Sequence, residues 1–468
     1  MEWISADKRM KRNGVCEDEM GKYFGTDGIR GVAGKDLDAE LAFKAGRAAA
    51  SVLIETGILS PQVFIARDTR ISCDMLQAAL SAGLCSAGAD VTLLGVLPTP
   101  AVAFLTAKSE ADMGIVISAS HNPFEHNGIK MFGRNGYKIS DSLEEMIEQL
   151  IDDGSGVYKA TGGDLGRINY DNGLYANEYI KYLSSFSTPG SFNGKIAIDC
   201  ANGAAAETAR LLFRKLHYAF VMTADSPDGI NINVDCGSTH LNALCDIMKT
   251  GQFGVGFAFD GDADRCLVVD EHGEVIDGDM LLAVFARDMS RAGKLKKNAF
   301  VGTVVSNSGM DAFARDNGFG FFRSAVGDRN VLELMTETGC NLGGESSGHI
   351  IFSDDATTGD GQLTSIMFLN ALGASGKTAS ELVHDIPRYP QVMPSYHLSG
   401  GPQQRDAIMS DDRLLAEIKK HEELLAGEGR ILIRPSGTEP LIRVLVEAKT
   451  EDLANEKAQY FIDFIKSL

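Results

Sequence analysis

The chain has 468 residues, of which 44% are hydrophobic and 23% are charged, and its formal net charge is −20 at pH 7. This length exceeds what one compact core accommodates and predicts three or four domains. The strong negative charge argues against nucleic acid or an anionic membrane as the main partner. The longest apolar runs, such as residues 281–286, are too short to span a bilayer.

Residues 1–20 carry charges throughout and lack the apolar segment of a secretory signal. They are predicted to be a disordered N-terminal extension, with a natural start at Met20 as an open alternative. The eight cysteines are scattered singly and form no CxxC pair, which disfavours a zinc site and is typical of reduced thiols. We therefore expect a cytoplasmic protein that binds neither nucleic acid nor a membrane.

From residue 21 onward one order of elements repeats: an apolar strand, a polar loop, a helix rich in small residues and another strand. Residues 63–70, 194–203 and 299–310 begin three such repeats. Alternation of strands with helices of about ten or more residues predicts α/β layers with mainly parallel strands. The repeats place domain I at residues 21–174, domain II at residues 175–274 and domain III at residues 275–388.

The order of elements changes after residue 388. Residues 430–448 read as two strands joined by a turn, and residues 452–468 read as an amphipathic helix. Its apolar side chains recur at helical spacing: Leu453, Phe461, Phe464 and Ile465. This stretch predicts a smaller α+β domain IV at residues 389–468.

Three aspartates, Asp260, Asp262 and Asp264, alternate at the end of the apolar strand in GVGFAFDGDADR. A turn there can aim several carboxylate oxygens at one point, and hard divalent cations prefer oxygen ligands. An Asp-Gly hairpin turn is one alternative, but three such carboxylates repel one another unless a cation holds them. An EF-hand loop is excluded, because Arg265 occupies the obligatory glycine position and the flanks read as strands. The pattern predicts a metal site in domain II.

The stretch VISASHNPFEHNGIK ends an apolar strand in a polar loop with an Asn-Pro, in domain I. Ligands of open α/β sheets bind at such strand ends. A serine exposed there can act as a nucleophile or carry a phosphoryl group, and Lys130 adds a cation that can neutralise phosphate or move a proton. Taken alone, the loop favours an ordinary turn serine over a functional one.

Two further loops carry polar groups. In NLGGESSGHI of domain III, Glu345, Ser347 and His349 suit a polyhydroxyl ligand, with a flexible turn as the alternative. In IRPSGTEPLIR of domain IV, Arg434 offers a bidentate fork for phosphate, followed by hydroxyl and N–H groups, with an ordinary strand–turn–strand as the alternative. Together the four loops indicate phosphoryl transfer on a sugar phosphate. They also supply the local positive charge that an acidic protein needs for an anionic ligand: Arg30, Lys130, Arg265, Arg329 and Arg434.

Seven motifs occur in the order and spacing of the α-phosphohexomutase superfamily: KYFGTDGIRG, ISASHNP with NGIK, NINVDCGSTH, DGDADR, VGDR, GGESSGH and RPSGTEPLIRV. From Lys22 onward the chain resembles this superfamily. The resemblance implies an α/β fold of four domains around a central cleft. Three of the domains are related α/β sandwiches with mixed sheets, and the smaller C-terminal domain is α+β.

The resemblance also implies roles for individual residues. Ser120 becomes phosphorylated, and its phosphate oxygen joins Asp260, Asp262 and Asp264 in holding one Mg²⁺ per subunit. The other catalytic residues are Lys130, Arg30, His121 and Arg265. The substrate-binding residues are Arg329, Glu345, Ser347 and His349. The phosphate-binding residues are Arg434, Ser436, Gly437 and Thr438.

The reaction so implied interconverts glucosamine 6-phosphate and glucosamine 1-phosphate through a 1,6-bisphosphate, and supplies UDP-N-acetylglucosamine for cell-wall synthesis. Glucose- or glucosamine-1,6-bisphosphate as activator, a kinase that primes Ser120 and a homodimer are further expectations. A phosphomannomutase or phosphoglucomutase of the same superfamily is the alternative, but those enzymes usually have Met where Ser346 stands. A non-catalytic sugar-phosphate-binding paralogue is disfavoured, because the serine and all three aspartates are present.

Overall fold

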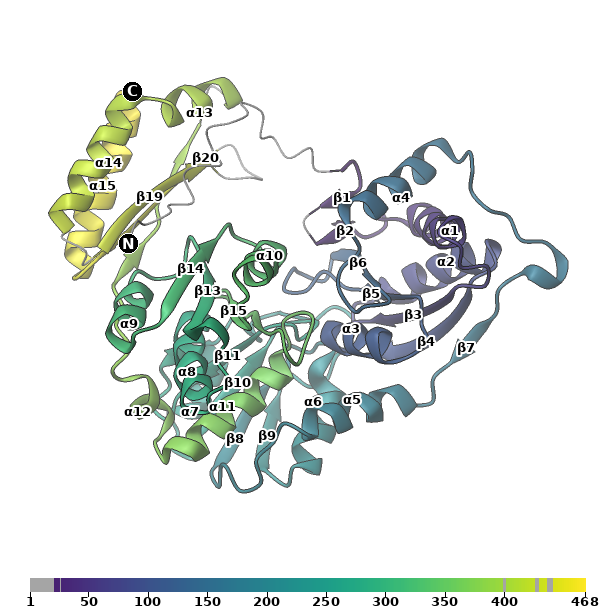
Figure 1. Ribbon diagram of the computed structural model, residues 1–468, viewed down its shortest axis with the longest axis horizontal. Helices are drawn as coiled ribbons and strands as arrows, with labels where there is room; N and C mark the ends of the chain where they lie inside the picture. Colours follow the sequence, from purple (N-terminus) through teal and green to yellow (C-terminus); the bar gives the residue numbers. More distant parts are fainter. Residues whose placement is uncertain (1–20, 26, 399–400, 426–428, 436–440) are drawn as a thin grey trace. The chain divides into compact units, whose positions relative to one another are not determined.

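The computed structural model describes residues 21–25, 27–398, 401–425, 429–435 and 441–468 (Figure 1). The described residues form two compact units. Unit 1 contains the chain up to Val275 together with Ile351–Gly373, and unit 2 contains Ile276–Ile350 and Ala374–Leu468. The predicted extension at residues 1–20 lies outside the described residues. Within the described part of the chain, no helix is long and apolar enough to cross a membrane.

The first sheet of unit 1 has seven strands in the order β1-β2-β6-β5-β3-β4-β7. The pairs β3–β4, β3–β5 and β4–β7 are parallel. The pairs β1–β2, β2–β6 and β5–β6 are antiparallel. The strands are β1 Phe24–Gly25, β2 Gly28–Val32, β3 Gln62–Arg67, β4 Asp90–Val96, β5 Met113–Ile117, β6 His126–Gly133 and β7 Ile168–Tyr170. The helices of this region are α1 Ala39–Glu55, α2 Cys73–Ser86, α3 Thr99–Lys108, α4 Asp141–Asp153, η2 Gly162–Asp164 and α5 Leu174–Ser184.

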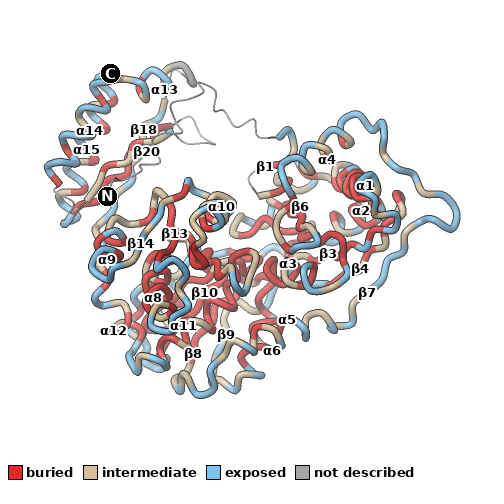
Figure 2. The backbone as a smooth tube through the Cα atoms, viewed as in Figure 1, coloured by how far each residue is buried: buried red, intermediate tan, exposed pale blue. Residues whose placement is uncertain are grey.

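Helices α1 and α2 pack closely, and Figure 2 shows buried residues in both. Two glycines allow the contact. A Cβ atom added at Gly83 would lie 2.1 Å from the carbonyl oxygen of Phe43, and one added at Gly46 would lie 2.4 Å from that of Leu80. The two backbones therefore approach more closely than any side chain permits.

The second sheet of unit 1 has the order β12-β11-β10-β8-β9. Strand β8 is parallel to β9 and β10, and β10–β11 is an antiparallel hairpin. The strands are β8 Lys195–Asp199, β9 Ala219–Thr223, β10 Val255–Phe259, β11 Cys266–Val269 and β12 Val275–Ile276. The helices are α6 Ala205–Lys215, α7 Asn242–Met248 and α11 Gly361–Ser375.

Helix α11 follows the third sheet in the chain but contacts the second. Phe368 packs edge-on against Phe257 of β10, with ring centroids 6.3 Å apart. Gln362 donates a hydrogen bond to the hydroxyl of Thr208 in α6 at 2.6 Å. Most of the helix is buried, and apolar residues lie all round it, as expected of a core helix.

The third sheet has the order β14-β13-β15-β16, with β13 parallel to both β14 and β15. Its strands are β13 Ala299–Thr303, β14 Gly320–Ser324, β15 Leu342–Gly344 and β16 Ile350–Phe352. The helices are α8 Gly278–Arg291, η3 Lys296–Asn298, α9 Gly309–Asn317, α10 Asp328–Thr338 and α12 Ala379–Val383.

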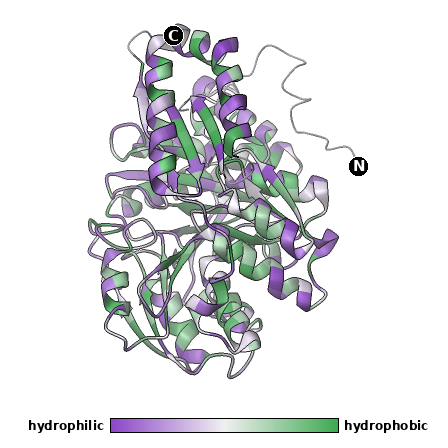
Figure 3. Cartoon of the chain, turned by 90° about the vertical axis from the view of Figure 1, so that its left-hand side faces the viewer, coloured by the Kyte–Doolittle hydropathy of each residue, from purple (hydrophilic) through white to green (hydrophobic). Residues whose placement is uncertain are grey.

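The fourth sheet is antiparallel around β20, which pairs with β17, β18 and β19. Its strands are β17 Gln391–Val392, β18 Ser395–His397, β19 Gly429–Pro435 and β20 Leu441–Ala448. The helices are α13 Gly401–Met409, α14 Asp412–Leu425 and α15 Glu451–Ser467. Phe461 and Ile465 of α15 are buried against the sheet, and Figure 3 shows the apolar strands beside helices of mixed hydropathy near the C-terminus.

A buried ion pair anchors the fourth sheet to the turn after β13, within unit 2. Glu447 is fully buried, accepts a hydrogen bond from the backbone N–H of Ser308 at 2.8 Å and pairs with Arg430 at 3.0 Å. Arg430 also donates to the backbone carbonyls of Val304 at 2.6 Å and Ser306 at 2.5 Å. One carboxylate thus connects β20 with the loop of the third sheet.

The predicted strand–helix–strand repeats are confirmed at residues 62–96, 195–223 and 299–324, as are the two C-terminal strands and the closing helix. The mixed sheets that the resemblance implies are confirmed for the first two sheets, whereas the alternation of strands and helices alone predicted mainly parallel strands. Short connections explain the difference, because β5–β6 and β10–β11 are too close in sequence for the crossover that parallel pairing needs. The boundaries of the four predicted domains and their central cleft stay predictions.

We expect the substitution Gly83→Ala to lower the free energy of unfolding by about 1–3 kcal/mol, because its methyl group must push α1 and α2 apart. The midpoint of thermal unfolding measures this. Gly163→Ala is the matched control, since nothing lies within 4 Å of a Cβ atom at that position. Equal midpoints for the two variants would contradict the close packing of α1 on α2.

Candidate active site

Ser120 lies in the loop between β5 and β6. Its side chain is directed at the loop that holds Asp260, Asp262 and Asp264, here called the metal loop. The residue is 1% exposed, and its φ of +52° falls in the left-handed region that serine rarely adopts. Its hydroxyl donates a hydrogen bond to Asp260 Oδ2 at 2.5 Å. The structure therefore brings the predicted serine and the first predicted aspartate into direct contact.

A fully buried arginine holds this loop in shape. Arg70 donates to the backbone carbonyl of Ser120 at 2.9 Å, to that of His126 at 3.1 Å and to that of Pro123. It also pairs with Asp68 at 2.8 Å, and neither side chain is exposed. The ends of the loop and its centre are thus tied to one guanidinium group.

Asp68 extends the network to the serine from the other side. Its Oδ2 accepts a hydrogen bond from the hydroxyl of Ser118 at 2.6 Å, and the oxygen of that hydroxyl accepts the backbone N–H of Ser120 at 2.9 Å. Buried polar networks in which every member is satisfied make a local structure rigid. This network accounts for the unusual backbone conformation of Ser120.

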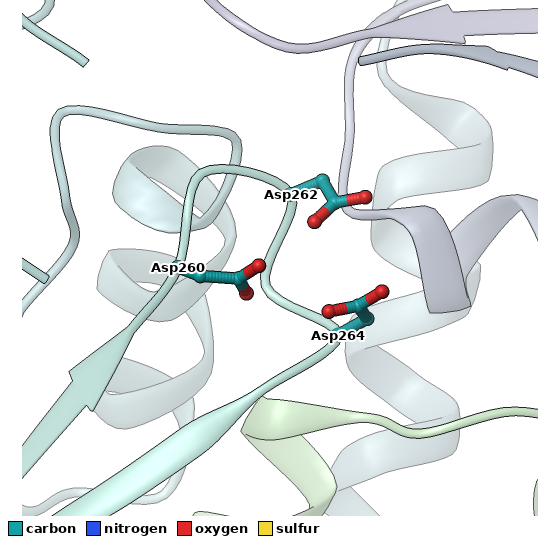
Figure 4. Close-up of side chains that lie close together, drawn as sticks. All are labelled: Asp260, Asp262 and Asp264. Atoms are coloured by element: carbon teal, nitrogen blue, oxygen red, sulfur yellow. The ribbon is translucent and has the colours of Figure 1, made fainter. Parts of the chain in front are cut away.

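The three aspartates follow β10 directly, and their carboxylates point toward one another (Figure 4). One oxygen of each lies within 4.8 Å of the others, and all three residues are buried. Asp262 Oδ1 is buried and has no hydrogen-bond partner among the described residues. Oxygen donors arranged in this way fit Mg²⁺, which accepts a few carboxylates together with phosphate or water.

The charge of this cluster is only partly balanced by the protein. Burial, together with the carboxylates of Asp264 and Asp262, raises the pKa of Asp260 well above its ordinary value, although Arg265 opposes the shift. A divalent cation would remove the repulsion and favour the ionised form. The electrostatics therefore agree with the prediction of a metal site.

Lys130 lies at the middle of β6, and its ammonium group reaches the same cluster. Its Nζ is 2.8 Å from Asp262, 3.0 Å from Asp27 and 3.6 Å from Asp264. Burial disfavours the charged form, but the nearby carboxylates outweigh burial and raise the pKa of Lys130. The side chain is thus a cation in this arrangement.

Three other predicted catalytic residues surround the serine. Arg265 contacts the ring nitrogen Nδ1 of His121 at 3.1 Å, and that nitrogen lies 3.4 Å from the hydroxyl of Ser120. Burial, with help from Arg265 and Arg30, lowers the pKa of His121 to about 4. Arg30 pairs with Asp27, which also contacts Lys130. The imidazole is therefore neutral near pH 7.

The predicted sugar-binding residues come together in unit 2, on the loop between β15 and β16 and at the start of α10. Glu345 accepts the backbone N–H of Gly327 at 3.0 Å, and His349 lies 3.9 Å from Asp328. Arg329 is the next residue of α10 and is half-buried. These contacts place the segment VGDR beside the loop GGESSGH.

Ser346 and its neighbours line a cavity of about 400 Å³ in unit 2. The backbone carbonyl of Ser346 accepts the N–H of Gly278 at 3.0 Å. The cavity is also lined by Asp277, Asp279, Asn307 and Arg388. Ser346 is thus next to α8 and to the segment that leads into the fourth sheet.

Of the predicted phosphate-binding residues, the structure describes Arg434 in β19. It lies directly opposite Arg443 of β20, and burial together with Arg443 lowers the pKa of Arg434. Like charges opposite each other on a sheet repel, so an anion would stabilise the pair. Ser436, Gly437 and Thr438 lie outside the described residues.

Several residues of the site were not predicted from the sequence: Asp27, Asp68, Arg70, Thr99 and Arg443. Asp27 and Arg443 lie inside the motifs KYFGTDGIRG and RPSGTEPLIRV, and Asp68 and Arg70 follow the strand of the first repeat. Their position within or beside motif text was the available signal. The contacts themselves join residues far apart in the chain, which a single sequence does not reveal.

Comparison with protein families matches four successive parts of the chain to models of phosphoglucomutase/phosphomannomutase. The alpha/beta/alpha domains I, II and III match residues 21–156, 177–273 and 277–389, and the C-terminal domain matches residues 401–463. The predicted fold class, three related α/β domains and a smaller C-terminal domain, is thereby confirmed.

Among curated proteins, the chain is 46% identical to a phosphoglucosamine mutase of Acetivibrio thermocellus over 450 residues, which cover 96% of this chain and 99% of that protein. It is 48% identical to a phosphoglucosamine mutase of Shouchella clausii over 449 residues, with the same coverage.

Among solved structures, a phosphoglucomutase/phosphomannomutase family protein of Burkholderia thailandensis is 27% identical with a TM-score of 0.79, over 94% of this chain and 95% of that one. A structure described as a putative phosphomannomutase of Thermus thermophilus shares the fold at 23% identity with a TM-score of 0.77, over 95% of this chain and all of that one.

We expect Arg70→Met to destabilise the protein by about 3–5 kcal/mol, because it leaves Asp68 buried without its cation. Thermal unfolding and protease cleavage within residues 118–126 measure the loss. Arg67→Met is the matched control, since Arg67 pairs at 2.9 Å with the exposed Asp74, a contact worth about 0–1 kcal/mol. If both variants melt alike and resist protease alike, the loop does not depend on Arg70.

Proposed function

The chain belongs to the phosphoglucomutase/phosphomannomutase family, and on that premise we propose that it interconverts glucosamine 6-phosphate and glucosamine 1-phosphate through a phosphoserine at Ser120. It is a mutase, and hence an isomerase. The observation that carries the proposal is the 2.5 Å contact between the Ser120 hydroxyl and Asp260, at a buried cluster of three carboxylates. Curated relatives at 46–48% identity that are named phosphoglucosamine mutase support the choice of substrate.

In the proposed reaction, the phosphoryl group of phosphoserine moves to the free hydroxyl of the sugar phosphate. The bond between Ser120 Oγ and phosphorus breaks, a bond between the sugar oxygen and phosphorus forms, and a 1,6-bisphosphate results. The other phosphoryl group of this bisphosphate is then transferred to Ser120: its bond to the sugar oxygen breaks, and a bond between phosphorus and Ser120 Oγ forms. Phosphoryl transfer mainly needs positioning and charge neutralisation, and the network around Ser120 provides the positioning.

Asp260, Asp262 and Asp264 would hold Mg²⁺ together with an oxygen of the phosphoserine. The ion would supply charge neutralisation on the group being transferred. Lys130 lies beside the carboxylate of Asp262 and Arg265 lies beside that of Asp264, and both add positive charge from the protein. Since its pKa is raised, Lys130 contributes first as a cation, and His121 contributes as a neutral hydrogen-bonding group.

For the substrate we propose that Arg329, Glu345, Ser347 and His349 bind the sugar hydroxyls. The contacts between their two segments support a common site within unit 2. Arg434, with Ser436, Gly437 and Thr438, would bind the phosphate that is not being transferred. The repulsion between Arg434 and Arg443 supports an anion at that place.

The substrate, a phosphosugar, is the main proposed partner. Either a kinase or a 1,6-bisphosphate of glucose or glucosamine would place the first phosphate on Ser120, and a homodimer stays a prediction. The product would supply UDP-N-acetylglucosamine for the cell wall. The alternative substrates are glucose and mannose phosphates, on which relaxed activity is expected because the chemistry of transfer is the same.

We expect Ser120→Ala to lose turnover completely, because no acceptor for the phosphoryl group remains. The measurement combines intact mass, before and after phosphatase, with assays on glucosamine, glucose and mannose phosphates side by side. The wild-type protein should carry one phosphate on Ser120 and prefer the amino sugar. Ser142→Ala removes an exposed hydroxyl as the matched control and should retain both phosphate and activity. Full turnover in Ser120→Ala would refute the covalent mechanism. If the wild-type protein preferred glucose or mannose phosphate, that sugar phosphate would become the proposed substrate in place of glucosamine phosphate.

Removal of divalent cations with EDTA should abolish turnover, and added Mg²⁺ should restore it, because the buried carboxylates otherwise repel the phosphoryl group. Asp260→Asn should lose turnover even in excess Mg²⁺. Asp246→Asn, at an exposed position of α7, is the control and should behave like the wild type. Turnover that survives chelation would remove the metal from the proposal.

A further inference from the structure

We propose that Thr99 is a positioning residue that orients the carboxylate of Asp262 for metal binding; the inference rests on the proposed metal site. Thr99 is the first residue of α3 and is 2% exposed. Its hydroxyl donates a hydrogen bond to Asp262 Oδ2 at 2.6 Å, and its backbone N–H donates to the backbone carbonyl of Asp262 at 2.9 Å. The metal loop is thus fixed to the helix through both backbone and side chain.

The contact gives the two carboxylate oxygens of Asp262 different surroundings. Asp262 Oδ2 accepts hydrogen bonds from Thr99 and from Lys130 at 2.8 Å. Asp262 Oδ1 is buried and has no partner among the described residues, while one oxygen of Asp262 lies within 4.8 Å of Asp260 and Asp264. A carboxylate held by one oxygen presents the other to a cation. Such outer groups commonly determine how well a ligand binds its metal.

Lys130 alone cannot fix this orientation. Its ammonium group is shared among Asp262, Asp27 and Asp264, and it can rotate among them. The Thr99 hydroxyl is held more rigidly, because Pro98 and Pro100 restrict the backbone on both sides of it. The N-terminus of α3 also places its partial positive charge beside Asp262.

The test measures metal binding without turnover. Phosphatase-treated protein is titrated with Mn²⁺, without sugar, and free Mn²⁺ is followed by electron paramagnetic resonance. Thr99→Val keeps the shape of the side chain but removes the donor, and its Mn²⁺ affinity should fall about tenfold or more. Thr99→Ser keeps the donor and should stay within about threefold of the wild type. In assays, Thr99→Val should need more Mg²⁺ for half-maximal activity yet recover most of kcat at saturating Mg²⁺.

Thr106→Val is the matched control. Thr106 is buried in the same helix, and its hydroxyl donates to the backbone carbonyl of Val102 at 2.7 Å rather than to the metal loop. Its Mn²⁺ affinity should equal that of the wild type. The inference fails if folded Thr99→Val binds Mn²⁺ like the wild type, or if Thr99→Ser or Thr106→Val loses as much affinity. Absence of Mn²⁺ binding in the wild type would instead refute the proposed metal site itself.

Discussion

Repulsion among three buried carboxylates is the constraint on which this structure depends. Asp260, Asp262 and Asp264 are placed within one short loop, where water cannot separate their charges. Such a cluster is costly unless cations meet it. Lys130 and Arg265 lie beside it but do not balance it, as the raised pKa of Asp260 indicates. An unbalanced negative cluster next to a serine hydroxyl agrees with the proposed cation-assisted transfer of phosphate.

The two loops that meet here come from the two sheets of unit 1, so their meeting must be enforced by the backbone. The carbonyl of Ser120 accepts a hydrogen bond from Asn233 at 2.9 Å as well as from Arg70. A Cβ atom at Gly261 would lie 2.5 Å from the same carbonyl oxygen. Glycine is therefore required at that position for the serine loop to rest on the metal loop. Contacts of the Ser120 backbone therefore hold the two loops together, in addition to the contacts that the side chains of Ser120 and the aspartates make.

Sequence patterns predicted the residues that carry the chemistry better than those that hold them in place. The alternation of the three aspartates after an apolar strand predicted a metal site from the local pattern, whereas Ser120 was singled out only by the family resemblance. Thr99 and Arg70 act through partners 163 and 50 residues away, and a single sequence does not reveal these contacts. Strand periodicity does not state direction, so the pattern alone predicted mainly parallel strands, and only the resemblance implied mixed sheets. Arg434 was predicted as a phosphate-binding residue, but Arg443 was not. The two lie opposite each other only because β19 pairs with β20, and the sequence does not show that pairing.

The return of α11 to the second sheet has a consequence for how the protein is made. The elements of unit 2 from Ile276 to Ile350 are inserted between two parts of unit 1. Phe257 of β10 already contacts Phe213 of α6, but its contact with Phe368 can form only after α11 has been synthesised. More than a hundred residues separate Phe257 from Phe368. Until they have been added, the apolar residues that α11 covers are exposed, and exposed apolar surface favours aggregation. Folding of unit 1, which contains Ser120, is thus completed late in translation.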